Sequence, residues 1–72
     1  MKFKDVVDAV HDIKKVVLDD GEGWVPSNHT IWLTQQQWDE LVLDPYILTL
    51  PLSAVDDLVK HLVLGVNVRV RP

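Results

Sequence analysis

The stretch Val66-Asn67-Val68-Arg69-Val70-Arg71 alternates strictly between valine and polar residues. Side chains along a β-strand point alternately to the two faces of the sheet. The three valines therefore face a core, while Asn67, Arg69 and Arg71 face the other way. This pattern predicts a half-buried strand with a basic outer face, and the rest of the chain has to supply what packs against its valines.

Residues 3–18 predict a first helix. Apolar side chains recur there at three- and four-residue spacing, which gives one apolar face. Many of them are β-branched, which lowers intrinsic helix propensity, so this helix depends on packing. Gly21 and Gly23 end it. The residues of the apolar face are Phe3, Val6, Val7, Val10, Ile13, Val16 and Val17.

Two further helices are predicted in the second half of the chain. Thr34 with Gln37 three residues later matches a capping box, which starts a helix that Asp44-Pro45 stops. Ser53 is the expected cap of the last helix, over residues 53–64, which Gly65 ends.

Two segments between the helices look extended. Residues 24–33 contain apolar residues on both sides of the polar turn 26–29, which is consistent with a hairpin. Tyr46-Ile47-Leu48-Thr49-Leu50 reads as a short buried strand bounded by prolines.

The resulting order of elements favours an α+β fold, with three helices packed on a small sheet of about three strands. Because the chain has 72 residues, we expect one domain spanning residues 1–72. The strand order stays open. The rival arrangement is winged-helix-like, with the helices at 34–43 and 53–64 as a helix-turn-helix pair and the last strand in a wing.

The composition excludes several kinds of catalytic and metal-binding site. The chain has no cysteine, which removes disulfides, thiolate zinc sites and thiol nucleophiles. Asp8, His11 and Asp12 fall on one helix side but are better explained as a solvated face than as metal ligands. No glycines of a nucleophile elbow surround the serines. We expect no catalytic, cofactor-binding or metal-binding residue, and therefore no enzyme.

Protein contact is the better prediction. Trp32 points away from its neighbours Ile31 and Leu33 in a strand, so either the first helix covers it or it is an exposed anchor for a partner. Trp38 fits the inner face of its helix and is expected in the core. If the termini lie close together, Lys2 and Lys4 join the basic end of the last strand in one patch, which suits a charged partner. The predicted protein-binding residues are Lys2, Phe3, Lys4, Trp32, Arg69 and Arg71.

The chain also resembles a known class of proteins. Its small size, mild acidity, lack of cysteine and opening Met1-Lys2-Phe3-Lys4-Asp5-Val6-Val7 are similar to those of small phage-encoded regulators of bacterial host machinery, of which those that bind the host RNA polymerase are best known. The resemblance is one of general character over the whole chain, without a motif, so no functional residue is carried over. It implies a protein of the bacterial cytoplasm that inhibits or redirects transcription by contact with a larger host protein. Separately, we expect the chain to be a monomer.

The alternative function is DNA binding of the winged-helix or excisionase kind. Lys60, Arg69 and Arg71 would then contact phosphates. Two observations oppose it: the net charge is −4, and Asp56 and Asp57 lie near the start of the helix that would read the bases, where they repel the DNA backbone. No stretch reaches the roughly 18 apolar residues that span a bilayer, so no membrane partner is expected.

Overall fold

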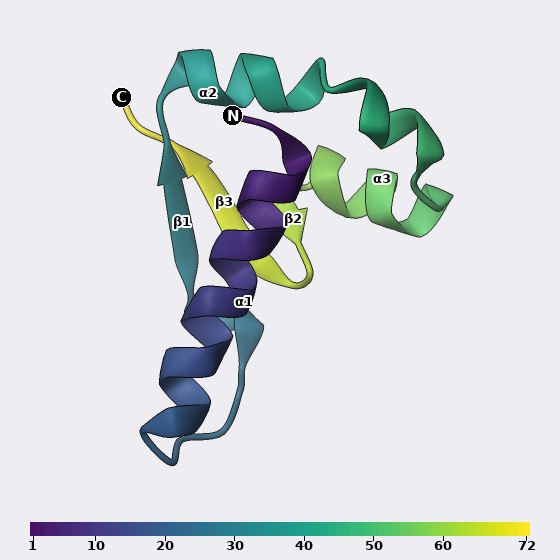
Figure 1. Cartoon of the computed structure of the whole chain (residues 1–72). Helices are drawn as coiled ribbons and strands as arrows, with labels where there is room; N and C mark the ends of the chain where they lie inside the picture. Colours follow the sequence, from purple (N-terminus) through teal and green to yellow (C-terminus); the bar gives the residue numbers. More distant parts are fainter.

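The computed structural model describes all residues from Met1 to Pro72 and confirms the α+β class (Figure 1). It contains three α-helices, two short 3-10 helices and a mixed sheet of three strands. In chain order the elements are α1 (Phe3–Asp19), η1 (Pro26–Asn28), β1 (Thr30–Leu33), α2 (Gln35–Val42), η2 (Pro45–Thr49), α3 (Leu52–Val59), β2 (Leu62–Val63) and β3 (Val66–Val70).

The strand predicted with most detail, β3, is the central strand of the sheet. The strand order is β1-β3-β2. β1 runs parallel to β3 with Ile31 opposite Val68, and β2 runs antiparallel to it with Val63 opposite Val66. Leu64 and Gly65, which join β2 to β3, both have positive φ angles, of 51° and 84°. Two such residues in a row are typical of the tight hairpin turn that matches strand twist.

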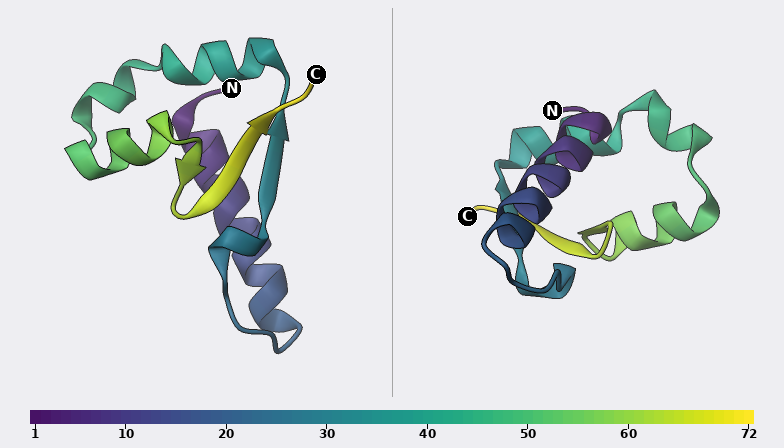
Figure 2. Two further views of the ribbon diagram at one scale, coloured as in Figure 1. Left: turned by 180° about the vertical axis from the view of Figure 1, so that it is seen from behind. Right: turned by 60° about the horizontal axis from the view of Figure 1, so that its bottom comes forward.

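The core lies between α1 and one face of the sheet. Figures 1 and 2, which view the chain from opposite sides, show α1 running along this face. Val66 and Val68 are fully buried while Arg69 is exposed, so the predicted alternation is confirmed. The nine buried residues are Phe3, Val6, Val10, Leu33, Leu41, Leu58, Val63, Val66 and Val68.

The start of α2 is also as predicted. The backbone N–H of Gln37 donates to Thr34 Oγ1 at 3.1 Å, and the backbone N–H of Thr34 donates to Gln37 Oε1 at 2.9 Å. This is the reciprocal capping box. It fixes where β1 ends and where the chain turns across the end of the sheet.

The predicted strand at residues 46–50 is wrong. The segment forms η2 and has no partner in the sheet. Side chains satisfy its backbone locally: Asp44 Oδ1 accepts from the N–H of Tyr46 at 3.0 Å, and Thr49 Oγ1 donates to the Tyr46 carbonyl at 2.7 Å. Such local bonds compete with strand pairing. Leu48 is 89% exposed, so the segment is not buried either.

The predicted ends of the third helix are wrong as well. Pro51, not Ser53, is the N-cap, because its extended backbone leads directly into a helix that starts at Leu52. The helix ends at Val59, because His61 adopts a positive φ of 60° and leads the chain into β2. Gly65 therefore closes a hairpin and does not end a helix.

The hairpin over residues 24–33 is not formed. Only Thr30–Leu33 joins the sheet. Pro26–Asn28 forms a 3-10 turn that Asn67 on β3 holds in place, because its side-chain amide donates to the carbonyls of Ser27 and His29 at 3.0 and 3.1 Å. The winged-helix rival fits poorly too. Residues 43–51 separate α2 from α3, whereas a helix-turn-helix unit is joined by a turn of about three or four residues.

Candidate protein-interaction surfaces

One face of the sheet carries no α-helix; only the short η1 lies beside it, bonded to Asn67. Because Leu33 and Val68 point toward α1, the alternating residues Trp32 and Arg69 point to the opposite side. These two residues lie directly opposite each other on neighbouring strands, and the Trp32 side chain is 50% exposed. The outer surface formed by Thr30, Trp32 and Arg69 is called the sheet face below.

The sheet face combines an apolar ring with a free cation. Arg69 is exposed and makes no ion pair, since the single ion pair of the protein joins Met1 to Glu40. Arg71 follows the end of β3, and its backbone N–H donates to the Leu33 carbonyl at 2.7 Å. This bond holds the basic end of the chain beside β1, which is an edge strand of the sheet.

The predicted residues of the N-terminal end lie elsewhere. Phe3 is only 8% exposed and belongs to the core, with its ring centroid 6.2 Å from that of Tyr46. Lys2 and Lys4 are exposed at the start of α1. Because α1 covers the other side of the sheet from Arg69, the lysines and the sheet face do not form one basic patch.

The largest hollow, of about 560 Å³, lies beside the first turns of α1. Its charged lining is mixed and consists of Lys2, Lys4, Asp8 and Asp44. Asp44 has a structural role there: it accepts from the backbone N–H groups of Tyr46 and Phe3, at 3.0 and 2.9 Å. These bonds hold its pKa below the ordinary value. No group of three or more potential ligand residues gathers here or elsewhere in the chain in a way that could hold a metal ion.

A second surface was missed in the sequence. Side chains of α2, η2 and α3 line an entirely apolar hollow of about 270 Å³, called the helical groove below. The right-hand view of Figure 2 shows these three elements as an arc that extends away from the sheet. The residues that line the groove are Trp38, Val42, Ile47, Val55, Leu58 and Val59.

The sequence signal for the groove was present but assigned to the core. Trp38 was expected to be buried; it is half-buried, and its ring stacks on His61 with centroids 4.2 Å apart. Val59, at the end of the apolar stripe of α3, is 73% exposed. Helical spacing predicts an apolar face, but does not tell whether the same chain covers it.

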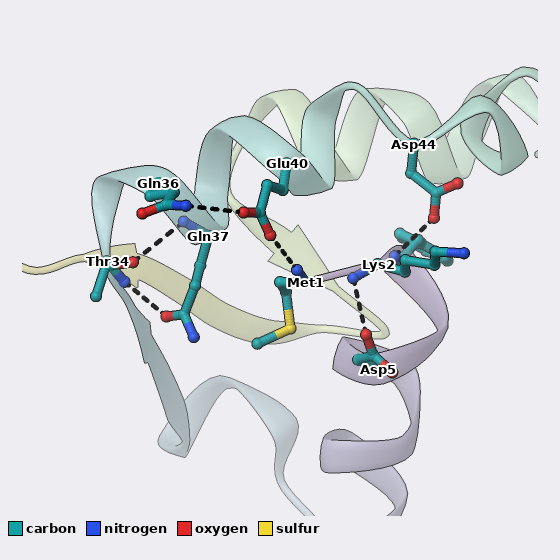
Figure 3. A network of polar contacts seen from close by, with 9 residues as sticks. Met1, Lys2, Asp5, Thr34, Gln36, Gln37, Glu40 and Asp44 are labelled. Carbon is teal, nitrogen blue, oxygen red and sulfur yellow. Dashed lines mark hydrogen bonds and ion pairs between the residues drawn. The ribbon is translucent and has the colours of Figure 1, made fainter.

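Acidic residues are concentrated around this groove. Residues 34–59 contain five carboxylates and no lysine or arginine. Two of the carboxylates hold the arc against α1: Glu40 pairs with the Met1 amino group, and Asp44 bonds to Phe3 (Figure 3). The pairing with Met1 lowers the pKa of Glu40. Asp39, Asp56 and Asp57 are exposed and make no ion pair.

Comparison with known proteins gives no further assignment: no protein-family model, no curated protein and no solved structure matches the chain. None of its helices has the length and apolar character needed to cross a membrane. The two surfaces are therefore the features of the molecule that indicate a function.

Proposed function

We propose that this chain is a non-enzymatic regulator that binds a larger protein through its sheet face. The observation that carries the proposal is a half-exposed Trp32 in register with an unpaired Arg69 on a sheet face without an α-helix. The resemblance to small phage-encoded regulators makes bacterial RNA polymerase the proposed partner and the bacterial cytoplasm the proposed compartment.

The chemistry of this pair suits a protein interface. A tryptophan side chain can bury about 150–250 Å² on binding, and tryptophan and arginine are the residues most enriched at energetic centres of interfaces. Strand pairing fixes both backbones before a partner arrives, so ordering them costs little on binding. Arg69 has no acidic partner inside the chain and is available to a carboxylate of another protein.

Purified bacterial RNA polymerase, as core enzyme and as holoenzyme, provides the direct test. We expect the wild-type chain to bind it and to change transcription from a promoter template. Trp32→Ala and Arg69→Ala are each expected to weaken binding by at least about tenfold, as expected for residues at the centre of an interface. Lys15→Ala is the control, because Lys15 is exposed on α1. Equal binding by wild type and Trp32→Ala, or no binding at all, would contradict the proposal.

Binding to DNA is the second candidate, favoured by the exposed Arg69 and Arg71 at the end of β3. A mobility-shift assay with random duplex at low salt separates it from the first. A shift that disappears as salt rises would favour the nucleic-acid function, because phosphate contacts release counterions. The exposed Asp56 and Asp57 on α3 argue against this outcome.

A further inference from the structure

The helical groove has the form of a half-completed helix bundle. Trp38 and Val42 lie one turn apart on α2, and Val55 and Val59 lie one turn apart on α3, so both helices direct an apolar stripe into the same hollow. Ile47 of η2 lines the part between them. Amphipathic helices of other proteins dock into such apolar grooves through side chains spaced three, four and seven residues apart.

We propose that the helical groove binds a basic amphipathic helix of another protein, at a site independent of the sheet face. The evidence for an apolar binding surface is that many apolar side chains in and around the groove are exposed. Among the three groove residues of α3, only Leu58 is buried, whereas Val59 is 73% exposed. Leu48 and Leu52, next to the groove in η2 and α3, are 89% and 84% exposed. An exposed apolar area of this extent is typical of an interaction surface.

Charge identifies the occupant. Asp39 follows Trp38, and Asp56 follows Val55, so each carboxylate lies about 100° around its helix from a lining residue and flanks the groove. One cation, Lys60, follows Val59 at the C-cap of α3, so the border is acidic on balance. Neither carboxylate is neutralised by an ion pair within the chain. A partner helix with lysine or arginine beside its apolar stripe would meet opposite charge on both sides.

The same charges oppose two other occupants. A second copy that placed its own groove against this one would bring identical acidic flanks together. An anionic membrane surface would also be repelled, since the five carboxylates of residues 34–60 outnumber the single lysine, Lys60, at the C-cap of α3. A basic amphipathic helix is the occupant whose binding is favoured by both the apolar lining of the groove and the carboxylates beside it.

The probe is a synthetic amphipathic peptide of leucine and lysine, about 14 residues or four turns long. Titrated into the ¹⁵N-labelled full chain, it is expected to shift amide resonances of α2, η2 and α3 and to leave β1 unchanged. A peptide of the same composition in scrambled order, without an apolar stripe, should bind at least about tenfold more weakly, because it cannot present its apolar residues on one face. A glutamate analogue should give no shifts at low salt.

Two matched variants test the location. Val59→Asp places a charge in the groove and is expected to weaken peptide binding by about tenfold or more. Val16→Asp is the control, because Val16 is a similarly exposed valine, at 61%, on α1. Both side chains are exposed, so both variants should fold, which their amide spectra verify. Trp32→Ala should leave peptide binding unchanged, whatever it does to binding through the sheet face.

The acidic border has its own test. The double variant Asp39→Asn with Asp56→Asn should bind the lysine peptide about threefold more weakly at low salt and lose part of the salt dependence. Three results would overturn the proposal: equal binding of ordered and scrambled peptides, equal binding by wild type and Val59→Asp, or dimerisation of the chain that Val59→Asp abolishes in the absence of peptide. Shifts caused by anionic vesicles but not by the peptide would overturn it as well.

Discussion

The molecule has two parts that use their apolar residues in opposite ways. One is built from α1 and the sheet, and the other is the arc of α2, η2 and α3. α1 and the strands supply seven of the nine buried residues, whereas α2 and α3 supply one each, Leu41 and Leu58. The arc nevertheless contains six of the eleven large hydrophobic side chains that are exposed: Val42, Leu43, Tyr46, Leu48, Leu52 and Val59.

This difference shows that the apolar content of the arc exceeds what its own folding uses. Burial of apolar area is the main favourable term in folding, and the arc forgoes most of it. Local polar bonds at Thr34 and Asp44 add to the packing of Leu41 and Leu58 in holding the arc. Surface kept apolar without a folding role is what a binding function requires.

The largest expected effect separates the two halves directly. Leu33 is 2% exposed, so Leu33→Ala should leave a cavity and lower the free energy of unfolding by about 3 kcal/mol. Leu48 is 89% exposed, so Leu48→Ala should change it by less than about 0.5 kcal/mol. Urea unfolding measures both changes in free energy, provided that the slope of the free energy against urea concentration is the same as in wild type. A large loss in Leu48→Ala would show that the arc is packed in solution and would remove the contrast.

Native-state hydrogen exchange tests the same contrast without mutation. The amide of Val68 donates to the His61 carbonyl inside the sheet and should exchange only through global unfolding. The amide of Val55 donates to the Pro51 carbonyl in the first turn of α3 and should exchange through local opening, at a free energy lower by about 2 kcal/mol. Equal protection would mean that arc and sheet unfold as one unit.

The sequence predicted the part built from α1 and the sheet well. Strict alternation over residues 66–71 and helical spacing over 3–18 identify β3 and α1, because the sheet and helix periods are distinct and one face of each is buried. Thr34 and Gln37 located the start of α2, since a capping box is a local feature. These signals do not depend on what the rest of the chain does.

The parts that failed depend on tertiary context. Residues 46–50 have strand propensity, yet the adjacent Asp44 accepts the N–H of Tyr46 and the segment pairs with no strand of the sheet. The β-ladder ends α3 early by recruiting Leu62. Of the predicted contact residues, Trp32 and Arg69 come together across β1 and β3, but the lysines of the N-terminal end do not join them, because sequence spacing gives no information about which side of the sheet α1 covers.

Capping within the arc gives the next prediction. Thr34 Oγ1 accepts the N–H of Gln37 at the start of α2, so Thr34→Ala should lower the free energy of unfolding by about 1 kcal/mol. Ser53 lies inside α3 and caps nothing, so Ser53→Ala should be neutral or slightly stabilising, because alanine is the better helix former. Thermal or urea unfolding measures the stability of both variants. A clear loss of stability in Ser53→Ala would mean that α3 begins after Leu52 in solution.

The smallest effect concerns the joint between the two halves and depends on pH. Asp44 lies on the arc side and accepts the backbone N–H of Phe3 at the start of α1, where the helix dipole also favours a negative charge. Its pKa is lowered below the ordinary 3.8 by hydrogen bonds from the Tyr46 and Phe3 backbones. A carboxyl with a lowered folded pKa stabilises the fold above its unfolded pKa and loses that contribution as the pH falls through the folded pKa.

Asp44→Asn should therefore have a lower urea midpoint than wild type at about pH 7, and the difference should shrink as the pH falls below about 3.8, where the wild-type carboxyl takes up its proton. Asp57→Asn is the control for the loss of one carboxylate, because Asp57 is exposed on α3 and makes no ion pair. A pH-independent difference for Asp44→Asn would assign its role to shape and hydrogen bonding alone. A difference that closes on acidification would show that the charge of Asp44 contributes to fastening the arc to α1, in addition to the buried Leu41 and Leu58.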